Sequence, residues 1–153
     1  MRRSEKEVKD IVEIEEVLGR AMICRLGLCI DNIPYVVPMN FAYMNNCLYL
    51  HSAKEGKKID IIRQNPNVCF EVEEDTELVK GGAVACRWGM KFKSVIGFGT
   101  ASLIEDKAEK KKALDLIMQQ YSDEKNFKYK DEQVDAVTVL QIRITEMSCK
   151  KSG

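Results

Sequence analysis

Three apolar runs follow one another early in the chain, and only short polar turns separate them. The turns are Asp31-Asn32 and Asn45-Asn46, residue types that accept the left-handed backbone of tight hairpins. Parallel neighbours need a crossover of about a dozen residues or more, and these connections are too short to supply one. We therefore expect an antiparallel meander of three strands at residues 21–30, 34–43 and 46–53.

Strand patterns return later in the chain, between helical segments. Strands are expected at 68–73, 92–105 and 136–148, which brings the total to about six. Gly97 and Gly99 predict a bulge or a close approach of the backbone within the second of these, and the irregular segment 75–88 predicts a surface excursion.

Helices are predicted where an aspartate can cap a periodic apolar pattern. Asp10 opens one helix that ends at Gly19, and Asp106 opens another whose apolar face reaches Tyr121. The polar stretch 122–135 is expected to be a loop or a frayed helix. The fold class is therefore mainly β: an antiparallel β-barrel with peripheral helices.

Length and charge narrow the classes of function. The 153 residues fit a single domain, 1–153. Acidic and basic residues are equal in number, 24 of each, so no global field attracts nucleic acid or an anionic membrane. The N-terminal segment is charged, and no apolar run is long enough to cross a bilayer. We expect a soluble, cytoplasmic protein with neither nucleic acid nor membrane as a partner.

Six cysteines are present, and most lie in apolar, strand-like runs. Without a secretory signal, buried free thiols are expected rather than disulfides. The chain has no Cys-x-x-Cys pair and one histidine, so no metal site is predicted.

A basic helix follows directly after the third run. Gly56, Lys57 and Lys58 open it and Asn65-Pro66 ends it. The first N–H groups of a helix and two ammonium groups together suit a phosphate, which predicts a phosphorylated cofactor. A pair of ordinary solvated lysines is the alternative interpretation.

His51, the single histidine, lies near the end of the third run, on the strand face that also carries Cys47, Tyr49 and Ala53. A lone histidine is more often structural than catalytic, but its place beside the basic helix makes it the candidate catalytic residue. With no second histidine and no Gly-x-Ser-x-Gly motif, a serine hydrolase triad is excluded, so a cofactor is expected to carry the chemistry.

Trp88 and Arg87 allow two interpretations. They are either a core residue and a surface residue, or an aromatic and a cation that cover a flat heterocycle. The Gly-x-Gly-x-x-Gly fingerprint is absent, so a Rossmann-type dinucleotide site is unsupported.

The residues together resemble a known family. The chain is similar to the flavin-binding split-barrel proteins related to pyridoxamine 5'-phosphate oxidase, specifically the nitroimidazole-resistance (Nim-type) branch. The resemblance covers nearly the whole chain, and its specificity comes from the order and spacing of the motifs. They are MRRSEKEV, CRLGL, PYVVPMNFAY, LYLHSAKEGKKIDIIRQNPNVCFEV, WGMKFKSVIGFG and a closing strand through Met147.

The resemblance implies a six-stranded antiparallel split barrel that forms a homodimer, with FMN in each of two clefts between the subunits. FAD is also possible, because some relatives of the barrel use FAD. Others use a deazaflavin or haem. By this resemblance, the flavin isoalloxazine would lie beside Val37, Pro38, Met39 and Asn40. His51, Ser52 and Ala53 would run along the flavin. Lys57 and Lys58 would hold its phosphate. The resemblance also implies that Ser94 and Val95 add contacts to the flavin and that Trp88 reaches it from the partner subunit.

The resemblance also implies a function. It suggests a flavin-dependent reductase that passes electrons from a reduced nicotinamide or another donor to a small electron-poor acceptor such as a nitroimidazole, with His51 positioning substrate or donating a proton. The alternatives are a flavin-binding or storage protein without turnover, and a pyridoxamine phosphate oxidase-like enzyme. True oxidases end in an Arg-Leu-x-Pro type motif, whereas this chain ends MSCKKSG.

Overall fold

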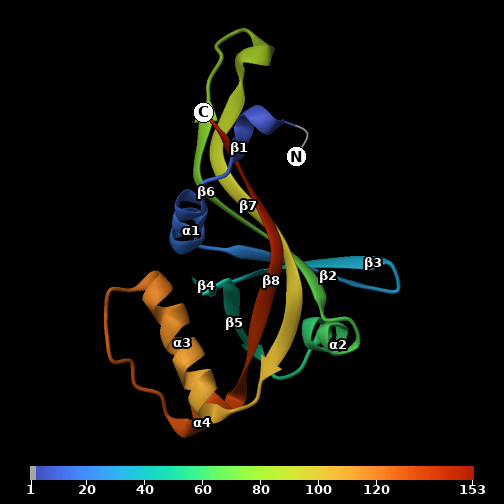
Figure 1. Ribbon diagram of the computed structural model, residues 1–153, viewed down its shortest axis with the longest axis vertical. Helices are drawn as coiled ribbons and strands as arrows, with labels where there is room; N and C mark the ends of the chain where they lie inside the picture. Colours follow the sequence, from blue (N-terminus) through green and yellow to red (C-terminus); the bar gives the residue numbers. More distant parts are fainter. Residues whose placement is uncertain (1–2) are drawn as a thin grey trace.

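One antiparallel sheet organises residues 3–153, the part of the chain that the computed structural model describes (Figure 1). Its strands are β1 (Glu7–Val8), β2 (Cys24–Ile30), β3 (Ile33–Met39), β4 (Phe41–Met44), β5 (Cys47–Ala53), β6 (Asn67–Val79), β7 (Gly89–Ile104) and β8 (Val137–Ser152). The helices are α1 (Ile11–Arg20), α2 (Lys57–Gln64), α3 (Lys107–Tyr121) and α4 (Asp131–Ala136), with 3₁₀ turns at Ser4–Lys6 and Ala85–Arg87. The predicted mainly β fold with peripheral helices is confirmed. Met1 and Arg2, which open the first motif of the family resemblance, lie outside the described residues.

The sheet has eight strands, not the six that were expected. One extra strand is β1, whose two residues are too few to show an alternating pattern. The other arises because the run 34–43 is interrupted at Asn40, which separates β3 from β4. Both predicted hairpins form, and both residues of each turn have positive φ, between 49° and 61°.

The strand order explains why the third run is not simply the next strand of a meander. The order is β3-β2-β6-β7-β8-β5-β4, so β3 and β4 are consecutive in the chain but lie at opposite ends of the hydrogen-bonded path. The middle run pairs with both of its neighbours, as predicted, but through two separate strands joined at Asn40. Asn40 joins β3 and β4, the two end strands of this path. The sheet must therefore curl back on itself, and it forms a split barrel (Figure 1).

The barrel interior is filled by one face of each long strand. Phe70, Leu26 and Leu50 have no exposed surface, and α2 packs against β2 through the buried Ile59 and Ile62. The predicted alternation in the first half of β8 is confirmed, because Leu140, Ile142 and Ile144 belong to the core cluster, whereas Val139, although buried, does not. Burial of these apolar side chains is the main source of stability for the sheet.

The helices begin where the capping patterns predicted. The Asp10 carboxylate accepts a hydrogen bond from the Val12 N–H over 3.0 Å, and the Asp106 carboxylate accepts one from the Glu109 N–H over 2.9 Å. The segment 122–135 is a loop that ends in the short helix α4, close to the expectation. Among residues 3–153, no helix combines the length and apolar character needed to cross a bilayer.

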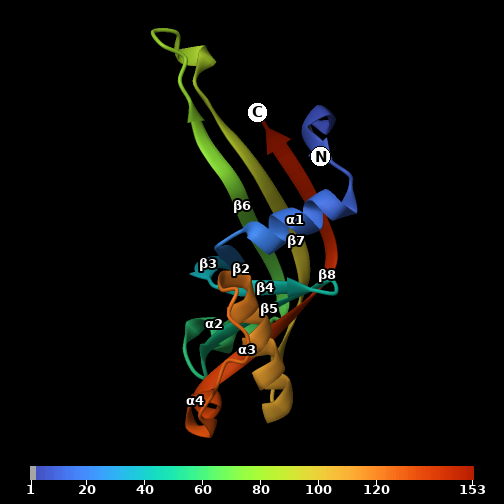
Figure 2. The same ribbon diagram turned by 90° about the vertical axis from the view of Figure 1, so that its left-hand side faces the viewer.

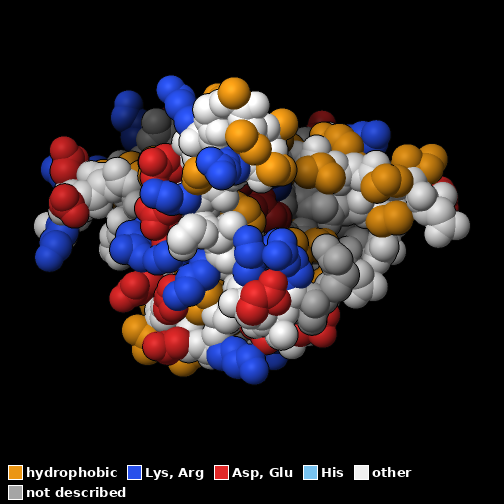
Figure 3. All heavy atoms as spheres, turned by 90° about the horizontal axis from the view of Figure 1, so that it is seen from above, with side chains coloured by type: hydrophobic (Ala, Val, Ile, Leu, Met, Phe, Trp, Pro, Cys, Tyr) orange, Lys and Arg blue, Asp and Glu red, His pale blue; other side chains and the backbone are white. Residues whose placement is uncertain are grey.

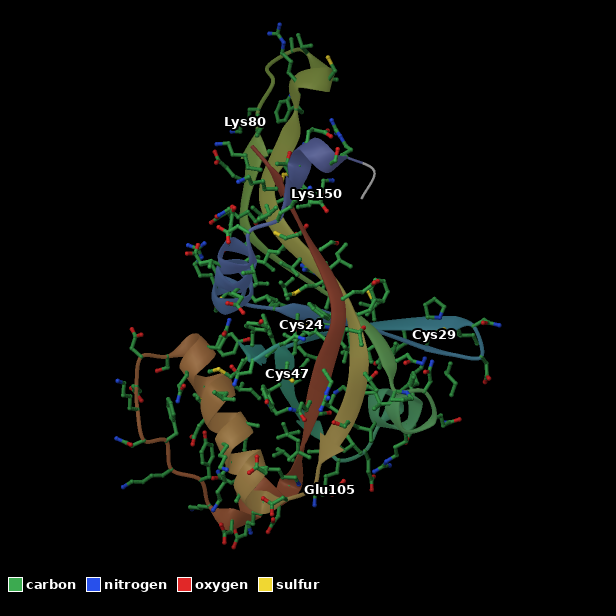
Figure 4. All side chains as sticks on the ribbon, in the orientation of Figure 1. Cys24, Cys29, Cys47, Lys80, Glu105 and Lys150 are labelled. Atoms are coloured by element: carbon green, nitrogen blue, oxygen red, sulfur yellow. The ribbon has the colours of Figure 1, made fainter. Side chains whose placement is uncertain are left out.

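Two strands project beyond the barrel as a β-hairpin, here called the arm (residues 75–92; Figure 2). The expected irregular excursion over 75–88 is confirmed for residues 80–88, which form no strand, but not for residues 75–79: β6 continues to Val79, past an irregularity in register between Glu74 and Glu77. The register of β7 with β8 shifts between Phe98 and Gly99, which confirms the predicted bulge. Lys80 marks the arm in Figure 4, and Glu105 marks the opposite end of β7.

All six cysteines are free thiols. Cys24 and Cys29 lie on β2 and Cys47 lies on β5 (Figure 4). Only Cys24 and Cys149 are buried, so the prediction of buried thiols is right for those two, whereas Cys86 is exposed near the tip of the arm.

Candidate functional site

The predicted anion site lies where the end of β5 meets the start of α2. Gly56 is the residue before the helix and has φ of 118°, a conformation that glycine adopts without strain. No side chain caps this helix end. Its first N–H groups therefore lack the side-chain partner that an N-cap supplies, and the positive end of the helix dipole is open to an anion.

Lys58 points back toward the strand. Its Nζ atom donates a hydrogen bond to the Oγ atom of Ser52 over 2.8 Å. Ser52 is only 5% exposed and Lys58 is partly buried. The strand therefore fixes the position of one ammonium group of the pair.

Lys57 lies on a different support. Its Nζ atom stands 4.7 Å from the centre of the Tyr35 ring, within the range of a cation–π interaction. Tyr35 comes from β3 and was not among the predicted site residues. No local signal marked it, because the contact joins residues 22 positions apart in two different elements.

Neither lysine is neutralised by a carboxylate. Among residues 3–153, no Asp or Glu oxygen lies within 4.0 Å of the Nζ atom of Lys57 or Lys58, although Glu55 and Asp60 are close in sequence. Many other lysines of the chain form ion pairs, among them Lys93, Lys107 and Lys111. The two cations at the start of α2 are therefore available to an external anion.

His51 lies on the outer face of β5, and its side chain is exposed. The predicted alternation is confirmed, because Leu50 and Ser52 face inward and are buried while His51 and Ala53 face outward. Along the same face, the Gln141 side chain donates a hydrogen bond to the Tyr49 hydroxyl over 3.1 Å. An exposed imidazole is free to meet a ligand.

The predicted stretch 37–40 alternates in the same way. Val37 and Met39 turn toward the barrel core, whereas Pro38 and Asn40 are exposed. A ligand on the outside would meet the side chains of Pro38 and Asn40, and Val37 and Met39 would take part mainly through their backbone.

The remaining predicted residues are distant within one chain. On β8, Val139 lies opposite His51 and Lys150 lies opposite Ser94, which separates the two sites by eleven residues, or about 35 Å along the strand. Val95 is fully buried, and Trp88 lies farther out on the arm, where its indole N–H donates to the Gly82 carbonyl over 2.9 Å. One chain therefore brings together the residues of β3, β5 and α2 but not Trp88, Ser94 or Val95.

A curled antiparallel sheet of this kind defines a split-barrel protein, and the start of α2 beside the end of β5 is its candidate anion-binding site. Over residues 10–151 the chain matches the pyridoxamine 5'-phosphate oxidase family, and it belongs to this pyridoxamine 5'-phosphate oxidase-like family. The family resemblance found in the sequence is thereby confirmed.

Several solved structures share the fold. A Bacteroides thetaiotaomicron protein named for 5-nitroimidazole antibiotic resistance is 36% identical, with a TM-score of 0.83 over 95% of this chain and 86% of that one. A Mesorhizobium loti FAD-binding protein is 25% identical, with a TM-score of 0.70 over 94% of this chain and 96% of that one. An Azotobacter vinelandii flavocytochrome reaches a TM-score of 0.84 over 100% of this chain and 72% of that one, but at 22% identity it shows the fold alone.

One curated relative matches over a shorter length. It is an uncharacterised protein of Rhizobium meliloti (strain 1021), 39% identical over 62 residues. The match covers 40% of this chain and 40% of that protein.

Proposed function

We propose that this protein is a flavin-dependent reductase that holds FMN or FAD by its phosphate at the start of α2. The observation that carries the proposal is the pair of unneutralised ammonium groups of Lys57 and Lys58, beside Ser52, in a chain of this family. Two cations and an uncapped helix end match the charge and hydrogen-bonding needs of a phosphate.

The exposed residues near this corner suit the rest of the cofactor. His51 and Ala53 would lie along the flavin, and Pro38 and Asn40 would border its ring system. A bound flavin supplies the electron transfer. His51 would orient the acceptor and hold or deliver a proton at an imidazole nitrogen, because its side chain is exposed on this face of β5 and an imidazole can both donate and accept a proton.

We further propose that two copies of the chain complete each site. The supporting observation is a row of outward-facing residues that crosses four strands through the pairs Phe98–Cys69, Cys69–Gly27 and Gly27–Val36. Phe98 is 48% exposed and Val36 is 62% exposed. A continuous row of exposed apolar side chains is unusual on a monomeric protein and is typical of an interaction surface.

The arm adds to this exposed apolar surface. Leu78, Val84, Trp88 and Met90 are all exposed on it, and an isolated two-stranded hairpin is at best marginally stable in water. Figure 3 shows apolar side chains gathered at the tip of the arm and along the projecting β2–β3 hairpin. In a homodimer, Trp88, Ser94 and Val95 of one chain would approach His51 of the other, which one chain alone does not achieve.

The acceptor and donor follow from chemistry and similarity. The relative named for 5-nitroimidazole resistance supports a small electron-poor acceptor such as a nitroimidazole. A reduced nicotinamide is the proposed electron donor, which suits a cytoplasmic enzyme.

The test begins with the absorbance spectrum of the purified protein and mass analysis of any small molecule that denaturation releases. The proposal expects flavin absorption, released FMN or FAD, and anaerobic oxidation of NADH or NADPH that depends on an added 5-nitroimidazole. A colourless protein that fails to bind either flavin would overturn the cofactor assignment. A flavoprotein that oxidises neither nicotinamide would instead be a binding or storage protein.

A further inference from the structure

The two lysines of the anion site are restrained in different ways. Lys58 donates to the buried Ser52 hydroxyl, whereas Lys57 is exposed and lies over the Tyr35 ring, 4.7 Å from its centre. A free lysine side chain samples many rotamers, and ordering it on binding an anion costs free energy. Whatever holds Lys57 in advance therefore affects how tightly the anion binds.

An aromatic ring holds a cation without neutralising it. A carboxylate partner would compete with an incoming anion for the ammonium protons, as Glu109 does for Lys112 at 2.8 Å. The ring face attracts the ammonium group by its quadrupole and leaves its hydrogen-bonding capacity on the far side free. Tyr35 therefore restrains Lys57 while its charge stays available.

The ring itself is well fixed. Tyr35 lies on β3 opposite Leu28, which is buried, and the ring is partly buried against the barrel core. On the same strand Val36 faces outward, so β3 presents the ring and the exposed apolar row on opposite sides. A side chain anchored on the core is a rigid support for the first residue of α2.

We infer that Tyr35 is a positioning residue for the cofactor phosphate: the face of its ring orients the ammonium group of Lys57 toward the bound anion. This inference rests on the proposed function, because it identifies the anion as the flavin phosphate. It predicts that Tyr35 matters for FMN and not for riboflavin, which lacks the phosphate.

The experiment measures Kd for FMN and for riboflavin by fluorescence titration of the flavin-stripped protein. Tyr35→Leu removes the ring, and Tyr35→Phe keeps it. We expect Tyr35→Leu to weaken FMN binding by about two- to five-fold, the size of a cation–π contact at an exposed site, with riboflavin unchanged. Tyr35→Phe should stay within about a factor of two of wild type, because the ring face remains.

A double-mutant cycle separates this role from a structural one. In a Lys57→Ala background, Tyr35→Leu should cause no further loss of preference for FMN over riboflavin. Equal weakening of FMN and riboflavin would overturn the inference, since it would show a general disturbance of the site. So would an equal loss in Tyr35→Phe, which would assign the effect to the hydroxyl.

The same data distinguish a failure of the role of Tyr35 from a failure of the proposed phosphate site. If Lys57→Ala lowers the preference for FMN but Tyr35→Leu does not, the phosphate site stands and the role of Tyr35 is overturned. If Lys57→Ala and Lys58→Ala together leave the preference unchanged, the phosphate site itself is refuted, and the inference with it.

Discussion

Lys58 and Ser52 are joined by a 2.8 Å hydrogen bond that ties the start of α2 to the end of β5. Ser52 is buried and its backbone is paired with Thr138 on β8, so the ammonium group is held against the centre of the sheet. Rigid elements hold functional groups more accurately than loops do.

Replacing Lys57 and Lys58 together by Ala should therefore weaken flavin retention. Two charged hydrogen bonds lost from a phosphate correspond to about 2 to 4 kcal/mol, roughly a 30- to 900-fold rise in Kd for FMN. Isothermal titration of the flavin-stripped protein measures this directly. Arg63→Ala is the matched control, because it removes an exposed cation from the far end of the same helix and should leave Kd unchanged.

His51→Ala is expected to change turnover and leave the fold intact. The side chain is exposed and makes no hydrogen bond among the described side-chain contacts, so the free energy of unfolding should change by less than about 0.5 kcal/mol. Thermal unfolding and steady-state rates on the same preparation test the two halves. A variant that loses stability while keeping full activity would assign His51 to a structural role.

Gly97→Ala should destabilise the barrel. A Cβ atom on Gly97 would overlap the ring of Phe70, which is fully buried and directly opposite on β6. Overpacking of this kind costs about 1 to 3 kcal/mol. Urea unfolding should show the loss, and Phe70→Leu in the same chain should relieve part of it.

The matched control for this prediction is Gly19→Ala. Gly19 lies in the last turn of α1, and a Cβ atom there would meet nothing within 4 Å. The same change should stabilise the protein at this position, by up to about 1 kcal/mol, because alanine loses less backbone entropy than glycine on folding. Destabilisation of equal size at both positions would show that the close contact with Phe70 is not the cause.

Thiol reactivity should separate the cysteines by location. Burial raises the pKa of the Cys24 thiol to about 12 from its ordinary 9.0, whereas Cys86 is exposed on the arm. Iodoacetamide followed by peptide mass mapping should label Cys86 in the native protein and Cys24 only after unfolding. Rapid labelling of Cys24 in the native state would contradict the described core.

The same raised pKa gives a direction for stability against pH. The folded state keeps the Cys24 proton to higher pH than the unfolded state does, so this contribution is fully present below pH 9 and is lost as pH rises toward about 12. Cys24→Ala should flatten that part of the alkaline unfolding curve relative to wild type.

Local signals in the sequence predicted most of the elements. Aspartate caps marked α1 and α3, and paired turn residues marked the two hairpins, because each signal acts within a few residues. The split of one run at Asn40 was missed, since it follows from the curvature of the closed sheet and from no preference of asparagine itself. The excursion at the tip of the arm was predicted from its two consecutive glycines, but the pairing of Glu77–Val79 with Gly89–Lys91 beside it was missed, because residues distant in sequence form those pairs.

The residues of the candidate site also divide into those that local sequence signals predicted and those that they did not. Lys57, Lys58, Ser52 and His51 are close in sequence and could be grouped from it, whereas Tyr35 reaches Lys57 only through tertiary folding. Ser94 and Val95 came from the family resemblance, as did the placement of Trp88 on a partner subunit, and local sequence patterns gave no measure of how far these residues lie from His51 within one chain.

The order of synthesis has a consequence for how this barrel can form. β8 is the last element in the described chain, and it lies in the middle of the sheet between β7 and β5. Until β8 leaves the ribosome, the hairpins on either side have no common strand and each presents an unpaired edge. The edges of β7 and β5 therefore stay unpaired, exposed to chaperones and to aggregation, until β8 has been made.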